Sequence, residues 1–291
     1  MLTANVASAV PLNRWKVLKQ RLLTAAILIP VIILATFYFK TFYFAALLAV
    51  FISLGAWEWA GLSGYQYTAS KVLFVLLVLT LLAISFIFRE TSLSTWLISL
   101  ALFWWLLAAL VVIVQQRRRT LNLGSRYLKA VIGLFSLVPA WLSLVILHDN
   151  SLHGGLYVIF LLTLIWLADS AAYFSGHRWG KTRLASVISP GKSWEGVLGA
   201  ILVSILVSAI FALATGMQAP DIIIFSLICS ITVMGSIVGD LIESLVKRLG
   251  NVKDSGSIFP GHGGVMDRID SLLAAAPIFL AGLWLTQGFE R

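Results

Sequence analysis

The chain has 291 residues, of which 60% are hydrophobic and 11% are charged, and its formal net charge is +9. A soluble domain carries about 25% charged residues, so this composition leaves too little polar surface to coat a water-soluble fold. It also excludes a disordered chain and a coiled coil. The single cysteine, Cys229, excludes an internal disulfide and a thiolate metal cluster, and we expect it to be a small packing residue.

Nine apolar runs are long enough to cross a bilayer as helices, each of which needs about 20 residues. They cover residues 22–39, 41–60, 72–88, 95–114, 130–147, 155–175, 197–217, 221–239 and 271–288. The first run lies among basic residues and lacks a small-residue cleavage site, so we do not expect a removed signal peptide. The sequence therefore predicts an all-α polytopic integral membrane protein with about nine transmembrane helices.

Lysine and arginine predict the orientation of these spans, because they gather in the cytoplasmic loops of membrane proteins. If the N-terminus is cytoplasmic, all of the 21 Lys and Arg residues except Lys40, Arg89 and Arg291 fall on the inner side. Nine spans then place the C-terminus outside. This distribution also explains the basic charge without nucleic acid, which we do not expect as a partner.

The spans divide the chain into three expected parts. Residues 1–21 form a basic cytoplasmic segment, residues 22–147 a membrane part with five spans, and residues 148–291 a catalytic membrane part with four spans. Two inner loops of the last part, 176–196 and 240–270, are rich in glycine, lysine, aspartate and histidine. Function is expected in these loops.

Acidic residues concentrate in this last part of the chain. Eight of the twelve lie between positions 169 and 270, and seven of these eight are candidates for a functional role: Asp169, Glu195, Asp240, Glu243, Asp254, Asp267 and Asp270. Ionisable groups at membrane depth are costly, which favours a functional role over a structural one. Asp169 is expected deep within a span, whereas hydration at the interface stays an alternative for Glu243 and Asp254.

Three of these carboxylates suggest a metal site. Asp267 and Asp270 are three residues apart at the start of the last span and project from one helix face, and Asp240 ends the preceding span. Converging carboxylates repel one another unless a cation lies between them, and Mg²⁺ binds carboxylates, water and phosphate oxygens. The alternative for Asp267 is an ion pair with Arg268. Upstream of Asp240, Gly235 and Gly239 form a G-x-x-x-G pair that should let a neighbouring helix pack closely.

The glycine-rich stretch before Asp267 is expected to bind phosphate. Consecutive backbone N–H groups in such a loop make an anion site, here offered by Gly263 and Gly264. Four cations surround it: Lys247, Arg248, Lys253 and Arg268. Carboxylates for a metal and amides and cations for phosphate are the components of a phosphoryl- or nucleotidyl-transfer site. His262 is open as an acid, a phosphate donor or a turn residue.

The other inner loop contains Gly-Lys-Thr at 180–182 and Gly-Lys-Ser at 191–193, but neither is a P-loop. That motif needs a glycine five residues earlier, where this chain has Ser175 and Ser186. Arg183 and Lys192 remain candidates for binding a triphosphate. A cluster that only sets membrane topology is the alternative.

Residues 244–270 read S-x-x-K-R, four residues, K-D, five residues, then P-x-H-G-G-x-x-D-R-x-D. This pattern resembles the signature of the phosphatidate cytidylyltransferase family, also called CDP-diacylglycerol synthases. A second similarity lies upstream, in W-x-x-D-S-x-A-Y at 166–173 and S-P-x-K-S-x-E-G at 189–196. The resemblance covers the last four spans, and the first five match only as a variable hydrophobic lead-in.

The resemblance implies a reaction in which CTP and phosphatidic acid give CDP-diacylglycerol and pyrophosphate. It implies Mg²⁺, with a second, monovalent cation such as K⁺ as a further option, and a homodimer in the bacterial inner membrane whose site faces the cytoplasm. By position, the metal carboxylates are Asp240, Asp267 and Asp270. The expected catalytic residues are Asp240, Lys247, Arg248, Lys253, Asp254, His262, Asp267, Arg268 and Asp270. The expected substrate-binding residues are Asp169, Arg183, Ser189, Lys192, Ser193, Glu195, Gly263 and Gly264.

Two other functions fit the same residues. One is a CTP-dependent polyprenol kinase, which transfers the γ-phosphate instead of CMP. The other is a cation-coupled membrane transporter, which would require broken helices and a site at the middle of the membrane.

Overall fold

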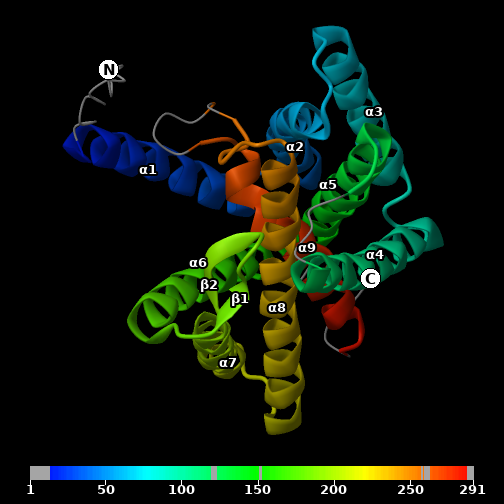
Figure 1. Ribbon diagram of the computed structural model, residues 1–291. Coiled ribbons are helices and arrows are strands. Elements are labelled where there is room, and N and C mark those ends of the chain that lie inside the picture. Colours follow the sequence, from blue (N-terminus) through cyan, green and yellow to red (C-terminus); the bar gives the residue numbers. More distant parts are fainter. Residues whose placement is uncertain (1–13, 119–122, 151–152, 257, 259–262, 287–291) are drawn as a thin grey trace.

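The structure is a computed structural model that describes residues 14–118, 123–150, 153–256, 258 and 263–286, with side chains from residue 26 onward. Nine helices run through the described residues (Figure 1). They are α1 (Arg14–Tyr38), α2 (Thr41–Ser63), α3 (Thr68–Ile87), α4 (Ser92–Arg118), α5 (Arg126–Asp149), α6 (Gly154–Trp179), α7 (Trp194–Ala214), α8 (Ala219–Leu249) and α9 (Met266–Trp284). Strands β1 (Arg183–Ala185) and β2 (Ser189–Ser193) lie between α6 and α7.

The predicted all-α membrane fold is confirmed, since each of the nine apolar runs forms a helix. Within the described residues, seven helices, α2 to α8, are long and apolar enough to cross a membrane. The apolar part of α1 that the structure describes, Ala26–Tyr38, is shorter. In α9 the apolar part follows a charged N-terminal segment, with Asp267 and Arg268 in the first turn and Asp270 at the start of the second.

The inner loops differ from the sequence expectation. The span predicted to end at residue 239 continues as α8 to Leu249, so Asp240 and Lys247 are helical rather than in a loop. The basic residues of its last turn favour this extension, because cations stabilise the C-terminal end of a helix dipole. The 176–196 loop contains an antiparallel hairpin that the all-α prediction did not include, with Arg183 opposite Ser193.

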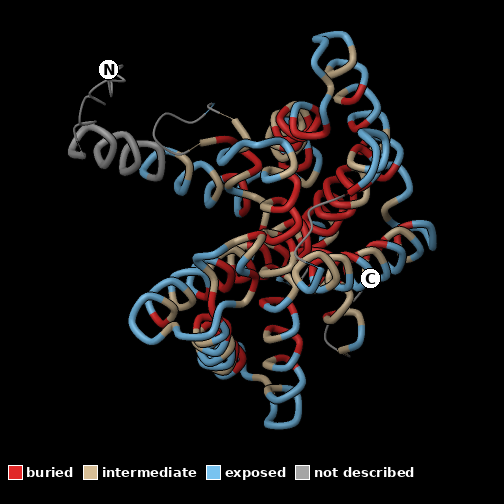
Figure 2. Tube along the Cα trace, viewed as in Figure 1, coloured by how far each residue is buried: buried red, intermediate tan, exposed pale blue. Residues whose placement is uncertain are grey.

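The core centres on α9, which packs against both α8 and α5. Figure 2 shows buried residues concentrated in the middle of the molecule and exposed residues on the outer helices. The exposed positions include large apolar side chains such as Trp96 and Leu106, as expected for surfaces that contact lipid. The charged residues of α8 and α9 are therefore positioned by the best-packed part of the fold.

The G-x-x-x-G pair brings α8 and α9 together as predicted. A Cβ atom at Gly239 would lie 2.5 Å from the Asp270 carbonyl oxygen, and one at Gly235 would overlap Ile278. Only glycine allows this approach. It places Asp240, the next residue of α8, near Asp270 of α9.

Candidate active site

Five carboxylates from three helices come together near the start of α9. Asp169 lies on α6, Asp240 and Glu243 on α8, and Asp267 and Asp270 on α9. Asp270 interacts electrostatically with Asp240 and Glu243, and Asp169 with Asp240. The Ser271 hydroxyl, 3.4 Å away, donates a hydrogen bond to Asp169 Oδ2. The structure thus brings together five of the seven acidic residues that the sequence singled out, and Glu195 and Asp254 lie outside this cluster.

Two lysines neutralise part of this charge. Lys247 Nζ lies 2.6 Å from Asp267 Oδ1 and 2.8 Å from Glu243 Oε2, and the Glu243 side chain is fully buried. Lys192 Nζ, brought in by strand β2, lies 2.7 Å from Asp240 Oδ2. Because buried carboxylates need such partners, the two lysines are integral to the cluster.

Asp267 is the most firmly held of the carboxylates. Its Oδ2 atom accepts hydrogen bonds from the Ser255 amide and hydroxyl, both at 3.0 Å, and from the Gly264 amide at 2.9 Å. Burial opposes its charge, but the hydrogen bonds from Lys247, Gly264 and Ser255 outweigh burial and hold the pKa of Asp267 below its ordinary value. Gly263 adopts φ +84°, and a Cβ atom there would lie 2.8 Å from Asp267 Oδ2. The Gly264 amide, which was expected to contact phosphate, donates its hydrogen bond to Asp267 in the structure.

The three carboxylates expected to bind a metal are engaged with protein groups. Asp240 contacts Lys192, Asp267 contacts Lys247, and the Ser271 amide donates to Asp270 Oδ1 at 2.7 Å. Within the described residues, no group of three or more His, Cys, Asp or Glu side chains has an arrangement that could hold a metal ion. The donors nevertheless fit Mg²⁺ in kind, since all are carboxylate oxygens.

Other predicted site residues surround the cluster without joining it. Arg248 Nε donates to the Ile188 carbonyl oxygen at 3.4 Å, which ties α8 to the hairpin. Lys253 and Asp254 are exposed in the segment between α8 and α9, and Arg183 is exposed on β1. His262 lies outside the described residues.

The second loop has a structural role that the sequence analysis did not assign. Ser193 is the N-cap of α7, and its hydroxyl accepts a hydrogen bond from the Gly196 amide at 3.2 Å. The Glu195 carboxylate accepts the Thr182 amide at 3.1 and 3.3 Å. Both residues were expected to bind substrate, and in the structure they hold the hairpin against α7. Ser189 pairs with Ala185 in the same hairpin.

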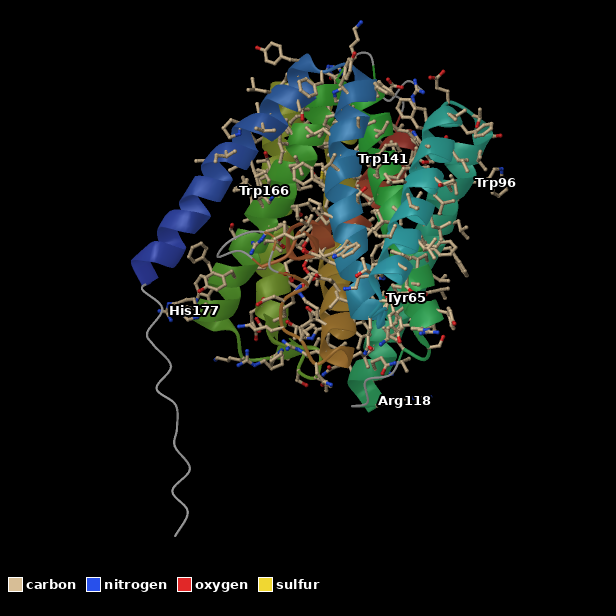
Figure 3. The ribbon with its side chains drawn as sticks, turned by 90° about the horizontal axis from the view of Figure 1, so that it is seen from above. Tyr65, Trp96, Arg118, Trp141, Trp166 and His177 are labelled. Carbon is tan, nitrogen blue, oxygen red and sulfur yellow. The ribbon has the colours of Figure 1, made fainter. Side chains whose placement is uncertain are left out.

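A cavity of about 390 Å³ opens from the carboxylate cluster between α1, α2, α5, α6 and α9. Asp169, Asp267, Arg268 and Asp270 line one end, and the rest of the lining is almost entirely apolar. Trp166 of α6 lies in the region between α1 and α2 (Figure 3) and also lines the cavity. The lining of α6 extends from Val158 to Asp169, about 17 Å along a helix.

Glu58 is a buried polar residue of the site that sequence analysis missed. This α2 carboxylate accepts the amides of Val265 and Met266 at 3.1 and 2.9 Å and the Ser255 hydroxyl at 2.9 Å. It belongs to no motif. The available signal was an acidic residue in the apolar run 41–60, which is unusual within a membrane span.

Comparisons with known proteins agree with this geometry. The model of the Cytidylyltransferase family matches residues 19–286. A phosphatidate cytidylyltransferase of Pseudomonas aeruginosa is 41% identical over 268 residues, covering 92% of this chain and 97% of the relative. One of Haemophilus influenzae is 37% identical, covering 90% of this chain and 97% of the relative. One of Bacillus subtilis is 41% identical over 134 residues, 45% of this chain and 49% of the relative. The chain therefore belongs to the cytidylyltransferase family and is a nucleotidyltransferase enzyme of the membrane.

Proposed function

We propose that this enzyme transfers CMP from CTP to phosphatidic acid and releases CDP-diacylglycerol and pyrophosphate. The observation that carries the proposal is the cavity with one charged end and an otherwise apolar lining. A lipid with a phosphate head group and two acyl chains has the same division of polarity. The names of the relatives support the same substrates.

The lipid phosphate is the nucleophile in this proposal. One of its oxygens attacks the α-phosphorus of CTP, a new O–P bond forms, and the bond to the β-phosphate oxygen breaks as pyrophosphate leaves with the electron pair. The attacking oxygen is already anionic, so no strong general base is required. The main barrier is to bring two polyanions together and to stabilise the leaving charge.

Cations of the site supply that stabilisation. Arg268 lines the charged end of the cavity and suits the lipid phosphate, because a guanidinium binds phosphate oxygens in a fixed geometry. Lys192 is partly exposed and can exchange its contact with Asp240 for the triphosphate. Further cations that can bind the nucleotide phosphates are Arg183 on β1, Arg248 near the end of α8 and Lys253 in the segment after α8.

We also propose Mg²⁺ as the cofactor, with K⁺ as an optional second ion. Asp240, Asp267 and Asp270 would hold the divalent cation, since they offer the oxygen donors that it prefers. When bound, the ion supplies positive charge to phosphate oxygens. The chain's own contribution is to position these carboxylates, through Lys247, Ser255 and Gly264 for Asp267 and through Ser244, whose hydroxyl lies 3.2 Å from Asp240 Oδ1.

The proposed setting is the bacterial inner membrane, with the site toward the cytoplasm and the enzyme as a homodimer. The excess of lysine and arginine on one side of the spans supports this orientation. It lets soluble CTP and the head group of a membrane lipid reach the same carboxylates.

The test uses membranes that contain the enzyme, phosphatidic acid, Mg²⁺ and CTP labelled on the α-phosphate. Label should enter the lipid fraction with the wild type and with Asp221→Asn, an exposed position on α8, and should be lost with Asp240→Asn on the same helix. Mg²⁺ should raise the melting temperature of the wild type but not of Asp240→Asn. Full activity of Asp240→Asn would defeat the carboxylate assignment.

Other outcomes identify the alternatives. Transfer of γ-label from CTP to a polyprenol, without CDP-lipid, would establish a kinase. Counterflow uptake into vesicles without CTP turnover would establish a transporter. Either result would overturn the proposed reaction.

A further inference from the structure

Glu58 connects the N-terminal helices to the segment that carries the family signature. The α2 carboxylate is buried, with 5% of the residue exposed. The residues that donate hydrogen bonds to it lie 197 to 208 positions further along the chain. Two of its donors are the Val265 and Met266 amides, at the N-terminus of α9. That terminus has no side-chain cap of its own. Glu58 therefore satisfies N–H groups that a helix start leaves unpaired and adds a favourable charge at the positive end of its dipole.

The chain between α8 and α9 is shaped around this carboxylate. A Cβ atom at Gly256 would overlap Glu58 Oε1, and one at Gly264 would overlap Glu58 Oε2 and the Ser255 hydroxyl. Glycine at both positions lets the backbone approach the carboxylate closely. The two glycines and Glu58 thus fit one another although α2 is remote in sequence.

Ser255 connects Glu58 to Asp267. Its hydroxyl oxygen lies 2.9 Å from Glu58 Oε2 and 3.0 Å from Asp267 Oδ2, so its single proton is shared between the two carboxylates and connects them. The Ser255 and Gly264 amides, which also donate to Asp267, belong to the segment that Glu58 fixes. On its other side, Asp267 holds Lys247.

We infer that Glu58 is a positioning residue for cytidylyl transfer, which anchors the segment before α9 and through Ser255 sets the orientation of Asp267. The inference rests on the proposed function. It gives a role to α2, which lies outside the family signature. Glu58 touches none of the reacting atoms in this scheme, and its effect is on how well Asp267 is oriented.

Glu58→Gln is the informative variant because it keeps the shape of the side chain and replaces one of its two acceptor oxygens with an NH₂ donor. In either orientation of the amide, its NH₂ group faces a backbone N–H, that of Val265 or that of Met266, and one hydrogen bond becomes a donor–donor contact. Trp59→Phe is the matched control. The neighbouring Trp59 is equally buried, and its Nε1 donates to the Lys129 carbonyl oxygen at 2.8 Å, so it ties α2 to α5 instead.

The first readout is steady-state kinetics on purified enzyme in lipid micelles. Misplacing a catalytic group by about 1 Å can lower the rate about 100-fold. We expect Glu58→Gln to lower kcat by about 30- to 100-fold, with a KM for CTP that changes by about threefold or less, because Glu58 makes no contact with Lys192 and Arg183, which are proposed to bind the triphosphate. Trp59→Phe, compared at the same folded fraction, should keep kcat within about threefold.

The second readout does not depend on turnover. Amide hydrogen exchange in peptides containing Val265 and Met266 should be faster in Glu58→Gln than in the wild type and unchanged in Trp59→Phe. Ser255→Ala removes only the bridging hydroxyl, so it should lower kcat less than Glu58→Gln, and combining the two should be no worse than Glu58→Gln alone. This variant also tests the bridge if Glu58→Gln fails to fold.

Two results would overturn the inference. One is a kcat for Glu58→Gln or Ser255→Ala within twofold of an active wild type. The other is an equal loss of kcat in Glu58→Gln and Trp59→Phe, which would reduce Glu58 to a general stabiliser of α2. A wild type that forms no CDP-lipid would instead refute the proposed function, and the exchange data would still report whether Glu58 holds the start of α9.

Discussion

Lys247 is the most buried cation of the site, and its removal should destabilise the protein strongly. Its side chain is 12% exposed and contacts Glu243, which is fully buried, and Asp267. Removing one partner of a buried pair costs about 3–5 kcal/mol, because it leaves an uncompensated charge. Lys247→Met keeps the apolar stem, and Asp267 keeps its donors from Ser255 and Gly264. We therefore expect a loss of about 3 kcal/mol, at the lower end of that range.

Lys192→Met is the matched control for this prediction. Lys192 and Asp240 form a pair of similar length, 2.7 Å, but their side chains are 26% and 28% exposed. Solvent screens such a pair, and its contribution is about 1 kcal/mol or less. For a protein of this size each kcal/mol moves the melting temperature by about 2–4 °C. Thermal unfolding in detergent should thus show a drop of about 6–12 °C for Lys247→Met and at most about 4 °C for Lys192→Met.

A double variant separates buried charge from lost packing. Glu243→Gln combined with Lys247→Met removes the orphaned carboxylate, so it should recover part of the lost stability. Equal shifts for the two lysine variants would refute the reasoning. A double variant that is less stable than Lys247→Met alone would refute it as well.

Three further predictions concern backbone and cavity. Gly263→Ala should lower the rate of CDP-lipid formation at least about tenfold, because φ +84° is strained for alanine and the added Cβ meets Asp267, whereas Gly191→Ala, where the Cβ has no atom within 4 Å, should be neutral. Leu48→Trp narrows the cavity and should reduce the rate with long-chain phosphatidic acid more than with short-chain; an equal reduction would argue against acyl chains in this space. Gly239→Leu should separate α8 from α9 and abolish activity, and a wild-type rate would contradict the close packing inferred for the pair.

Sequence predicted the features of the site that depend on local pattern. The apolar runs gave the helices, and the spacing of Asp267 and Asp270 placed both on one face at the start of α9. Gly235 and Gly239 predicted that a neighbouring helix packs closely beside α8, and the structure shows that this helix is α9. These inferences need only helix geometry and the cost of polar groups in lipid.

Contacts between segments that lie far apart in the chain could not be predicted from the sequence. Glu58 meets Val265 and Met266 only because α2 packs against the start of α9, and no spacing rule connects them. Ser193 and Glu195 have structural contacts that the sequence analysis did not assign. Their resemblance to a family motif predicts substrate binding, and in the structure the serine is an N-cap and the glutamate accepts an amide from the hairpin. A serine at the start of an apolar run was itself a capping signal.

Lys192 and Lys247 differ in burial, and this difference gives them different roles in the proposed reaction. A polyanionic nucleotide entering the cluster must find cations that can turn toward it. Lys192, a quarter exposed and held by Asp240 and a short hairpin, can do so at little cost. Lys247 cannot leave Glu243 and Asp267 without exposing charge in an apolar interior, so it stays as the fixed positive centre around which Asp267 is oriented. Glu58 holds the same carboxylate from the opposite side through Ser255, so the carboxylate cluster is rigid at Asp267 on α9 and adjustable at Lys192 on β2.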